Sequence, residues 1–271
     1  MLATHADWSA ARASSFKRDG FFTFERFLGK RAVRMLRASV DAMLRCGGGV
    51  KDEEWVLGLH ETLAPDRNWM WSLAREVSPI AAAILGEPVA LYCSQISCKS
   101  PAAPSGAPRS KRVPCHQDCR GDGGVVTFWI ALDRVDASNG GMWFERGGHA
   151  AGRRPLIPLR STADLAAAQR NARYNVFHAA GDPTHEVRLP CGGATVHHPH
   201  LPHASAPNGH RFRRRRAIIL RFMAAADVAP APPPVVAAGD VKSSDGRSRE
   251  QRALPISRSA PYPATYVEPG R

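Results

Sequence analysis

The chain contains 271 residues, six of them cysteine, and carries a formal net charge of +13. A chain of this length can bury a substantial core, so one main domain is expected. It has no apolar run long enough to span a membrane, no pattern typical of a secretory signal and too few cysteines for a disulfide scaffold. We therefore expect a cytoplasmic protein without a membrane partner.

The first third of the chain is predicted to be helical. Apolar residues at helical spacing indicate helices over about 8–18, 30–45 and 67–86. Asp7 is the expected N-cap of the first helix, and Gly20 is its stop signal. In the third stretch Pro79 is expected to stand at the first position of a restarted helix, because proline lacks the N–H that a helix interior needs.

A different pattern begins near residue 88, where short β-prone runs alternate with glycine and proline turns. Helices followed by many short strands predict a mainly β fold, an antiparallel barrel or sandwich with a helical buttress. A loop at 101–108 and a helix at 163–175 interrupt the strands, and residues 228–271, rich in Ala, Pro, Ser and Arg, are predicted to be an irregular tail. The expected strands cover about 21–24, 90–97, 114–118, 125–132, 142–145, 186–189, 193–198 and 215–223.

The sequence Cys115-His116-Gln117-Asp118-Cys119 carries the strongest chemical signal. Residues two apart on a strand point the same way, so His116 and Asp118 aim an imidazole and a carboxylate at one place. A third, distant histidine would complete the 2-His-1-carboxylate set that suits non-haem Fe(II). The candidates are His149, His178, His185, His197, His198, His200, His203 and His210.

Two other interpretations of these motifs remain open. Cys115 and Cys119 could suggest zinc, although no second thiol pair accompanies them. The arginine run at 211–216 could bind nucleic acid, or one of its arginines could face inward and pair with the carboxylate of an oxo-acid co-substrate. The second interpretation explains why the run follows the densest group of histidines.

The chain also resembles the phytanoyl-CoA dioxygenase-like branch of the Fe(II)/2-oxoglutarate-dependent oxygenases. The resemblance covers roughly residues 16–223. The HxD motif at 116–118 is weak evidence alone, because it occurs by chance in many chains, whereas the ordered set of blocks is specific. These blocks are FKRDGF (16–21), Lys99, HQD (116–118), WIALD (129–133), NGG (139–141), RGGH (146–149), HASAPN (203–208) and RRAI (215–218).

The resemblance implies a role for particular residues. His116, Asp118 and His203 match the iron ligands, with His198 or His200 as alternatives to His203. Arg215 matches the arginine that anchors 2-oxoglutarate, but it stands one residue further from His203 than expected, so Arg214 is a rival. Residues that often line the 2-oxoglutarate pocket are matched by Lys99, Thr127, Trp129 and Ser205.

The fold implied is a double-stranded β-helix, a cupin-like jelly-roll barrel, with a helical part at 1–87, the barrel at 88–227 and the tail at 228–271. The implied cofactors are Fe(II), 2-oxoglutarate and O2. Relatives that transfer halogen have a small residue in place of Asp118, so hydroxylation of a small-molecule or acyl substrate is implied, and the outer arginines of the run at 211–216 could attract an anionic substrate. The alternatives are a basic nucleic-acid-binding module and a metal-binding barrel without oxygenase activity; His149 could contact substrate.

Overall fold

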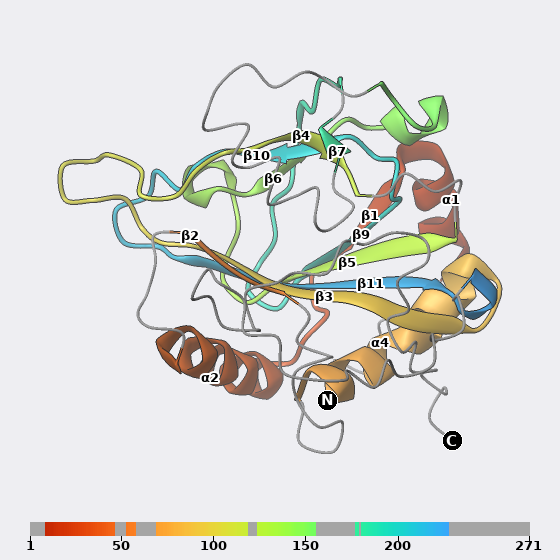
Figure 1. Cartoon of the computed structure of the whole chain (residues 1–271), viewed down its shortest axis with the longest axis horizontal. Helices are drawn as coiled ribbons and strands as arrows, with labels where there is room; N and C mark the ends of the chain where they lie inside the picture. The colour runs from red at the N-terminus through yellow and green to blue at the C-terminus, as the bar shows by residue number, and fades with distance from the viewer. Residues whose placement is uncertain are drawn as a thin grey trace, which may run out of the picture.

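The computed structural model describes residues 9–46, 53–57, 69–118, 124–155, 177–178 and 180–227. In this part of the chain two antiparallel sheets face each other, and helices cover the outer face of the larger sheet (Figure 1). The helix expected at 163–175 and the irregular tail expected at 228–271 lie outside the described residues.

The larger sheet has six strands in the order β1-β9-β5-β11-β3-β2. Every neighbouring pair is antiparallel, and β11 is the central strand that pairs with both β3 and β5. The strands are β1 (Phe21–Phe24), β2 (Glu53–Leu57), β3 (Val89–Lys99), β5 (Val125–Ala131), β9 (Ala194–His197) and β11 (Arg215–Ala224).

The smaller sheet has five strands in the order β7-β4-β10-β6-β8. Successive strands cross between the sheets: β4, β6 and β10 lie in the smaller one, while β5, β9 and β11 lie in the larger one (Figure 1). This alternation is the jelly-roll arrangement, which confirms the predicted fold class. The strands are β4 (Val113–Gln117), β6 (Met142–Phe144), β7 (Phe177–His178), β8 (His185–Glu186) and β10 (His203–Ser205), and short 3-10 helices occupy Ala137–Asn139, Gly148–Ala151 and Ala225–Asp227.

Among the described residues, three α-helices accompany the sheets: α1 (Ala10–Asp19), α2 (Lys30–Cys46) and α4 (Trp69–Leu85). α2 and α4 lie against the outer face of the six-stranded sheet (Figure 1). The apolar stripe predicted for α2, from Val33 to Leu44, is buried in one cluster with Phe128 of β5 and Ile218 of β11. Burial of this stripe explains why a helix with a basic, polar outer face stays folded here. In the described chain no helix is both long and apolar enough to cross a membrane.

The start of α1 differs from the prediction, whereas its end agrees with it. Ser9, and not Asp7, is the N-cap, and its hydroxyl accepts a hydrogen bond from the backbone N–H of Arg12 at 3.4 Å. Gly20 ends the helix in the left-handed conformation, with φ of 82°, and its N–H donates to the carbonyl of Phe16. A glycine suits this turn because other residues pay a steric cost at positive φ.

The prediction that Pro79 restarts a helix is wrong, because α4 runs through it without a break. Proline leaves the carbonyl of the residue four positions earlier, Arg75, without its usual helix partner. The hydroxyl of Ser78 donates to this same carbonyl at 3.1 Å. The side chain therefore supplies the hydrogen bond that the proline cannot make.

The predicted strands agree with the observed ones to within a few residues, but strands β2, β7 and β10 were not predicted. β10 carries His203 and has only three residues, next to a proline-rich turn. A strand this short has no readable alternation. Its pairing with β4 and β6 stabilises it instead.

Candidate metal centre and co-substrate pocket

The two faces of the six-stranded sheet differ in chemistry. On β5 and β11 the side chains that point to the helices are apolar apart from Arg216, which is ion-paired at the start of β11, whereas those that point between the sheets include buried polar and charged groups. A buried charge is costly unless it is paired and hydrogen-bonded, so a group of buried charges often marks a functional site. The inward-facing polar residues include Lys99, Arg215, Arg221, Thr127 and His197. The space between the sheets is therefore the place to look for a site.

His116, Asp118 and His203 meet in this space. Each offers one ligand atom, and these atoms all lie within 4.8 Å of one another. Oδ1 of Asp118 is 3.9 Å from Nε2 of His116 and 3.6 Å from Nε2 of His203. The pairing of β4 with β10 brings this about, because His116 and His203 are directly opposite in the register. Among the described residues this is the group with donor atoms close enough for a metal ion.

Both histidines are oriented by their own backbone. Nδ1 of His116 lies 2.8 Å from the carbonyl of Pro114, and Nδ1 of His203 lies 2.8 Å from the carbonyl of Leu201. A carbonyl only accepts, so each Nδ1 carries the proton and each Nε2 keeps a lone pair. Burial lowers the pKa of His203 to about 4, so its imidazole is neutral and ready to bind a metal near neutral pH.

Asp118 is held as an ionised carboxylate. Burial by itself raises its pKa, but the guanidinium of Arg221 and neighbouring histidines outweigh burial and hold the pKa well below its ordinary range. Oδ1 accepts from Nη2 of Arg221 at 2.6 Å, while Oδ2 accepts from Oγ1 of Thr127 at 2.8 Å and from Nε2 of His197 at 3.1 Å. Two imidazoles and one carboxylate that converge in this way fit Fe(II).

The structure distinguishes Arg215 from Arg214. Arg215 is buried between the sheets, where its Nη1 donates to Oγ of Ser97 at 3.1 Å and its guanidinium lies 5.5 Å from the ring of Trp129. Arg214 points to α2, where its Nη1 lies 3.4 Å from the carboxylate of Asp41. Successive residues of an extended chain point to opposite faces, so Arg214, just before β11, and Arg215, its first residue, lie on opposite faces of the sheet.

Lys99 and Ser205 lie together at the same end of the sheets as Arg215. Lys99 is directly opposite Arg215 in the β3–β11 register. Its Nζ donates to Oγ of Ser205 at 2.9 Å and to the carbonyl of Ala206 at 2.6 Å. Of the four residues expected to line the co-substrate pocket, Lys99, Trp129 and Ser205 are thus near Arg215 or bonded to each other, whereas Thr127 lies beside Asp118.

Sequence reasoning missed Arg221, and it named His197 only as a candidate third ligand and not as a hydrogen-bond partner of Asp118. Arg221 is six residues after Arg215 on one strand, so the two side chains must point to the same face. His197 is the last residue of β9, the strand that pairs with β5. A charged residue in an otherwise apolar strand was the signal. Its significance required knowing which face of the strand meets Asp118.

The histidines left open as alternatives lie elsewhere. The ring of His198 packs against those of Phe16, His149 and His200 at centroid distances of 6.0, 5.2 and 5.3 Å. His149 reaches α1, where Nε2 is 3.1 Å from the carbonyl of Lys17. Neither His198 nor His200 joins the group around Asp118. Because His197 points inward, its neighbour His198 must point out of the sheet.

The alternative of a zinc site gains no support from Cys115. Burial, with a contribution from the nearby carboxylate of Glu145, raises the pKa of this thiol to about 11, so it is protonated near neutral pH. Zinc binds the thiolate. Cys119 lies outside the described residues.

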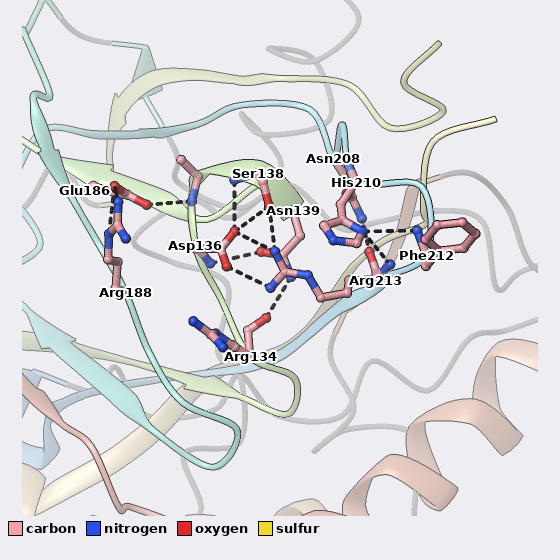
Figure 2. Close-up of polar contacts among 11 residues, drawn as sticks. Arg134, Asp136, Ser138, Asn139, Glu186, Arg188, Asn208, His210, Phe212 and Arg213 are labelled. Atoms are coloured by element: carbon pink, nitrogen blue, oxygen red, sulfur yellow. Dashed lines mark hydrogen bonds and ion pairs between the residues drawn. The ribbon is translucent and has the colours of Figure 1, made fainter. Parts of the chain in front are cut away.

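A polar network fixes the loop between β10 and β11 (Figure 2). The guanidinium of Arg213 donates to both carboxylate oxygens of Asp136, at 2.7 and 3.0 Å, and to Oγ of Ser138 at 2.6 Å. Nδ2 of the buried Asn208 donates to the carbonyls of Lys99 and Arg213 at 3.1 and 2.8 Å. Arg213 and Asn208 therefore set the position from which β11 begins, and with it the position of Arg215.

The same network bears on the arginine run. Arg213 pairs with Asp136, Arg214 with Asp41, and Arg216 with both Asp41 and Asp133. These charges are used within the protein, so the run does not form the continuous basic stripe that a nucleic-acid interface would use.

Comparison with known proteins agrees with this arrangement. The family model for phytanoyl-CoA dioxygenase (PhyH) matches residues 16–217. No curated protein matches the chain.

Three solved structures illustrate the shared fold. The chain is 21% identical to the non-haem alpha-ketoglutarate-dependent carbocyclase SnoK from nogalamycin biosynthesis, over 81% of this chain and 85% of that one, with a TM-score of 0.61. It is 20% identical to the epimerase SnoN in complex with Fe3+, alpha-ketoglutarate and nogalamycin RO, over 93% and 94%, with a TM-score of 0.63. It is 20% identical to EvdO2 from Micromonospora carbonacea var. aurantiaca complexed with 2-oxoglutarate, over 81% and 92%, with a TM-score of 0.60.

The family match begins within α1, ends within β11 and includes all three candidate ligands. It also includes Lys99 and Arg215 at the other end of the site. Fold, metal-binding group and family model support an iron- and 2-oxoglutarate-dependent oxygenase or a related activity, with Fe(II), 2-oxoglutarate and O2 as its cofactors. The chain belongs to the phytanoyl-CoA dioxygenase (PhyH) family.

Proposed function

We propose that the protein is an Fe(II)- and 2-oxoglutarate-dependent hydroxylase of a small-molecule substrate, with His116, Asp118 and His203 as the iron ligands and Arg215 as the anchor of 2-oxoglutarate. The observation that carries this proposal is the convergence of one ligand atom from each of the three residues within 4.8 Å, with Oδ1 of Asp118 lying 3.9 and 3.6 Å from the two Nε2 atoms. When bound, iron and 2-oxoglutarate supply an oxidant that activates a C–H bond, with succinate and CO2 as co-products.

The chain's own residues hold and orient these groups. The carbonyls of Pro114 and Leu201 fix the two imidazoles with Nε2 directed at the metal. Arg215 offers a planar, permanently charged fork to a distant carboxylate, in a buried place where an unpaired carboxylate would be costly. Trp129 and Phe144 exclude water from the space between the sheets, because both are buried there.

Asp118 supports hydroxylation over halogen transfer. A carboxylate in this position fills the place that a halide would need. The structural relatives include a carbocyclase and an epimerase, so the product distinguishes three outcomes of the same oxidation. Hydroxylation adds an oxygen atom to the substrate, ring closure removes two hydrogen atoms, and epimerisation leaves the mass unchanged. Mass spectrometry of products from candidate substrates separates these outcomes, and we expect the first.

The first test is an anaerobic titration with Fe(II) and 2-oxoglutarate, followed by the visible charge-transfer band of the chelate. We expect the band with the wild-type protein and its loss in His203→Ala, with His200→Ala as the matched control that retains it. Arg215→Leu should weaken the affinity for 2-oxoglutarate by about 100-fold, since a charge-assisted bidentate pair is lost. Arg214→Leu, an adjacent arginine paired with Asp41 outside the site, should leave the affinity unchanged.

Other results would favour the alternatives. Iron binding without a band in the presence of 2-oxoglutarate indicates a metal-binding barrel that lacks oxygenase activity. No iron binding, together with DNA or RNA binding that weakens steeply with salt, indicates a nucleic-acid-binding module. A band that survives in both His116→Ala and His203→Ala would remove these residues from the ligand set.

A further inference from the structure

Three inward-facing residues on three adjacent strands surround the carboxylate of Asp118. In the sheet register Arg221 of β11 is directly opposite Thr127 of β5, and Thr127 is directly opposite His197 of β9. We call Arg221, Thr127 and His197 the cross-strand row. Each member donates a hydrogen bond to the carboxylate of Asp118. Asp118 directly follows β4 of the smaller sheet, so it contacts the row from across the space between the sheets.

The row gives the two oxygens of the Asp118 carboxylate different numbers of hydrogen bonds. Oδ2 accepts from Thr127 and His197, so both of its lone pairs are used. Oδ1 accepts one hydrogen bond, from Arg221, and also lies nearest the two Nε2 atoms. Oδ1 therefore has a lone pair available for a metal, whereas Oδ2 has none. The hydrogen bonds orient Asp118 to bind a metal through one oxygen.

His197 is committed to this task. Its side chain is buried and lies against a carboxylate, whose oxygens only accept hydrogen bonds, so the ring nitrogen that contacts Asp118 carries the proton. Nε2 lies 3.1 Å from Oδ2 of Asp118, whereas Nδ1 is buried without a hydrogen-bond partner among the described residues. A neutral imidazole with its proton on Nε2 satisfies the carboxylate and leaves the Nδ1 lone pair in an apolar place beside Phe144.

Arg221 adds a full positive charge to this arrangement. Its Nη2 is 2.6 Å from Oδ1, and the side chain is buried on the inner face of β11. A cation bonded to a ligand oxygen withdraws electron density from it, and in a buried setting the effect is weakly screened. Less donation from Asp118 disfavours the more highly charged Fe(III) relative to Fe(II).

We propose that Arg221 is a positioning residue which, together with Thr127 and His197, holds Asp118 as a one-oxygen ligand and raises the reduction potential of iron bound at His116, Asp118 and His203. This inference rests on the proposed metal centre. With one oxygen of Asp118 committed to the metal, the residues that would hold iron would be two imidazoles and one carboxylate oxygen, a ligand set that suits Fe(II) with room for co-substrates.

The test measures the Fe(III)/Fe(II) potential of the iron-loaded, full-length protein without 2-oxoglutarate, by anaerobic mediated titration. In Arg221→Met we expect the ratio of Fe(III) to Fe(II) affinity to rise at least about tenfold, which lowers the potential. Arg221→Lys, which keeps the charge, should stay within about threefold of wild type. Arg216→Met is the matched control: it removes another largely buried, ion-paired arginine from the same strand, but one that faces α2, and it should leave the potential unchanged.

A second readout reports coordination directly. The visible absorption of bound Co(II) should change in intensity and position in Arg221→Met and stay as in wild type in Arg216→Met. If Arg221→Met does not fold, Thr127→Val decides the matter, because it removes one donor to Oδ2 with little change in shape. We expect the same direction of shift in potential there, about two- to threefold in the affinity ratio.

Each result has a distinct meaning. An unchanged potential in the folded Arg221→Met protein, or in Thr127→Val where that variant decides, overturns the inference while the metal centre stands. An equal shift in Arg216→Met also overturns it, because the effect would then come from general destabilisation. If the wild-type protein binds neither Fe(II) nor Co(II), the proposed function fails and this inference fails with it.

Discussion

The two faces of β11 differ in chemistry: one packs against the helices, and the other carries charged groups between the sheets. Ile218, Leu220 and Phe222 point to the helices and are buried with the apolar residues of α2 and α4. Arg215 and Arg221 point between the sheets, where they meet Trp129 and Asp118. The outer face stabilises the fold by removing apolar surface from water, whereas the inner face keeps charges buried at a cost. A strand can do both because its side chains alternate.

Replacing Asp118 tests the inner face most severely. Asp118→Ala removes a proposed iron ligand and leaves the buried guanidinium of Arg221 without its carboxylate. We expect turnover of 2-oxoglutarate to fall below about a thousandth of wild type, measured as succinate formation. Asp41→Ala is the control, because it removes a carboxylate of α2 that pairs with Arg214 and Arg216 outside the site, and it should keep the wild-type rate. Wild-type rates in Asp118→Ala would remove Asp118 from the proposed ligand set.

Adjacent arginines of β11 should separate the two faces. We expect Arg215→Leu to weaken 2-oxoglutarate binding about 100-fold. Arg216→Leu should instead lower the free energy of unfolding by about 3 kcal/mol, because Asp133 and Asp41 lose their partner, with the affinity for 2-oxoglutarate retained. Calorimetric titration and urea denaturation of both variants check this. Equal losses of affinity in the two variants would contradict the division of labour.

The outer face should respond to truncation through stability alone. Ile218 is fully buried among apolar residues, so Ile218→Ala should cost about 3 kcal/mol of unfolding free energy through lost burial and a residual cavity. In the fraction that remains folded, the affinity for Fe(II) should match wild type. A large loss of metal affinity in the folded variant would mean that the two faces are coupled.

The smallest expected effect concerns His198, the outward neighbour of His197. Burial, together with the nearby imidazoles, lowers the pKa of His198 to about 4. The unfolded chain, with an ordinary histidine pKa near 6.5, binds the proton more readily, so stability falls as the pH drops from about 6.5 towards 4. Allowing for its partial exposure, we expect His198→Gln to reduce the loss between pH 7 and 5 by about 1 kcal/mol, measured by denaturation at each pH. An identical pH dependence in the variant would assign the loss to other groups.

Much of this architecture could be predicted from local patterns. Helical spacing located α2, the glycine at position 20 ended α1, and β-prone runs between turns located most strands. The spacing of His116 and Asp118 indicated a metal site because two-residue periodicity is a property of any strand. The break expected at Pro79 was wrong since the compensating hydroxyl of Ser78 depends on its rotamer and not on helix propensity.

The remaining features depend on which strands become neighbours. The sequence by itself determined the fold class, the jelly-roll resemblance and the candidate ligands, because periodicity and motif order are local or ordered along the chain. Only the tertiary structure decided that Arg215 points inward while Arg214 meets Asp41, and that Arg221, Thr127 and His197 converge on Asp118. Arg221 and Asp118 are 103 positions apart along the chain, and Arg214 and Asp41 are 173 apart. Their contact exists because antiparallel pairing sets β5, β9 and β11 in one register and brings β4 across the space between the sheets.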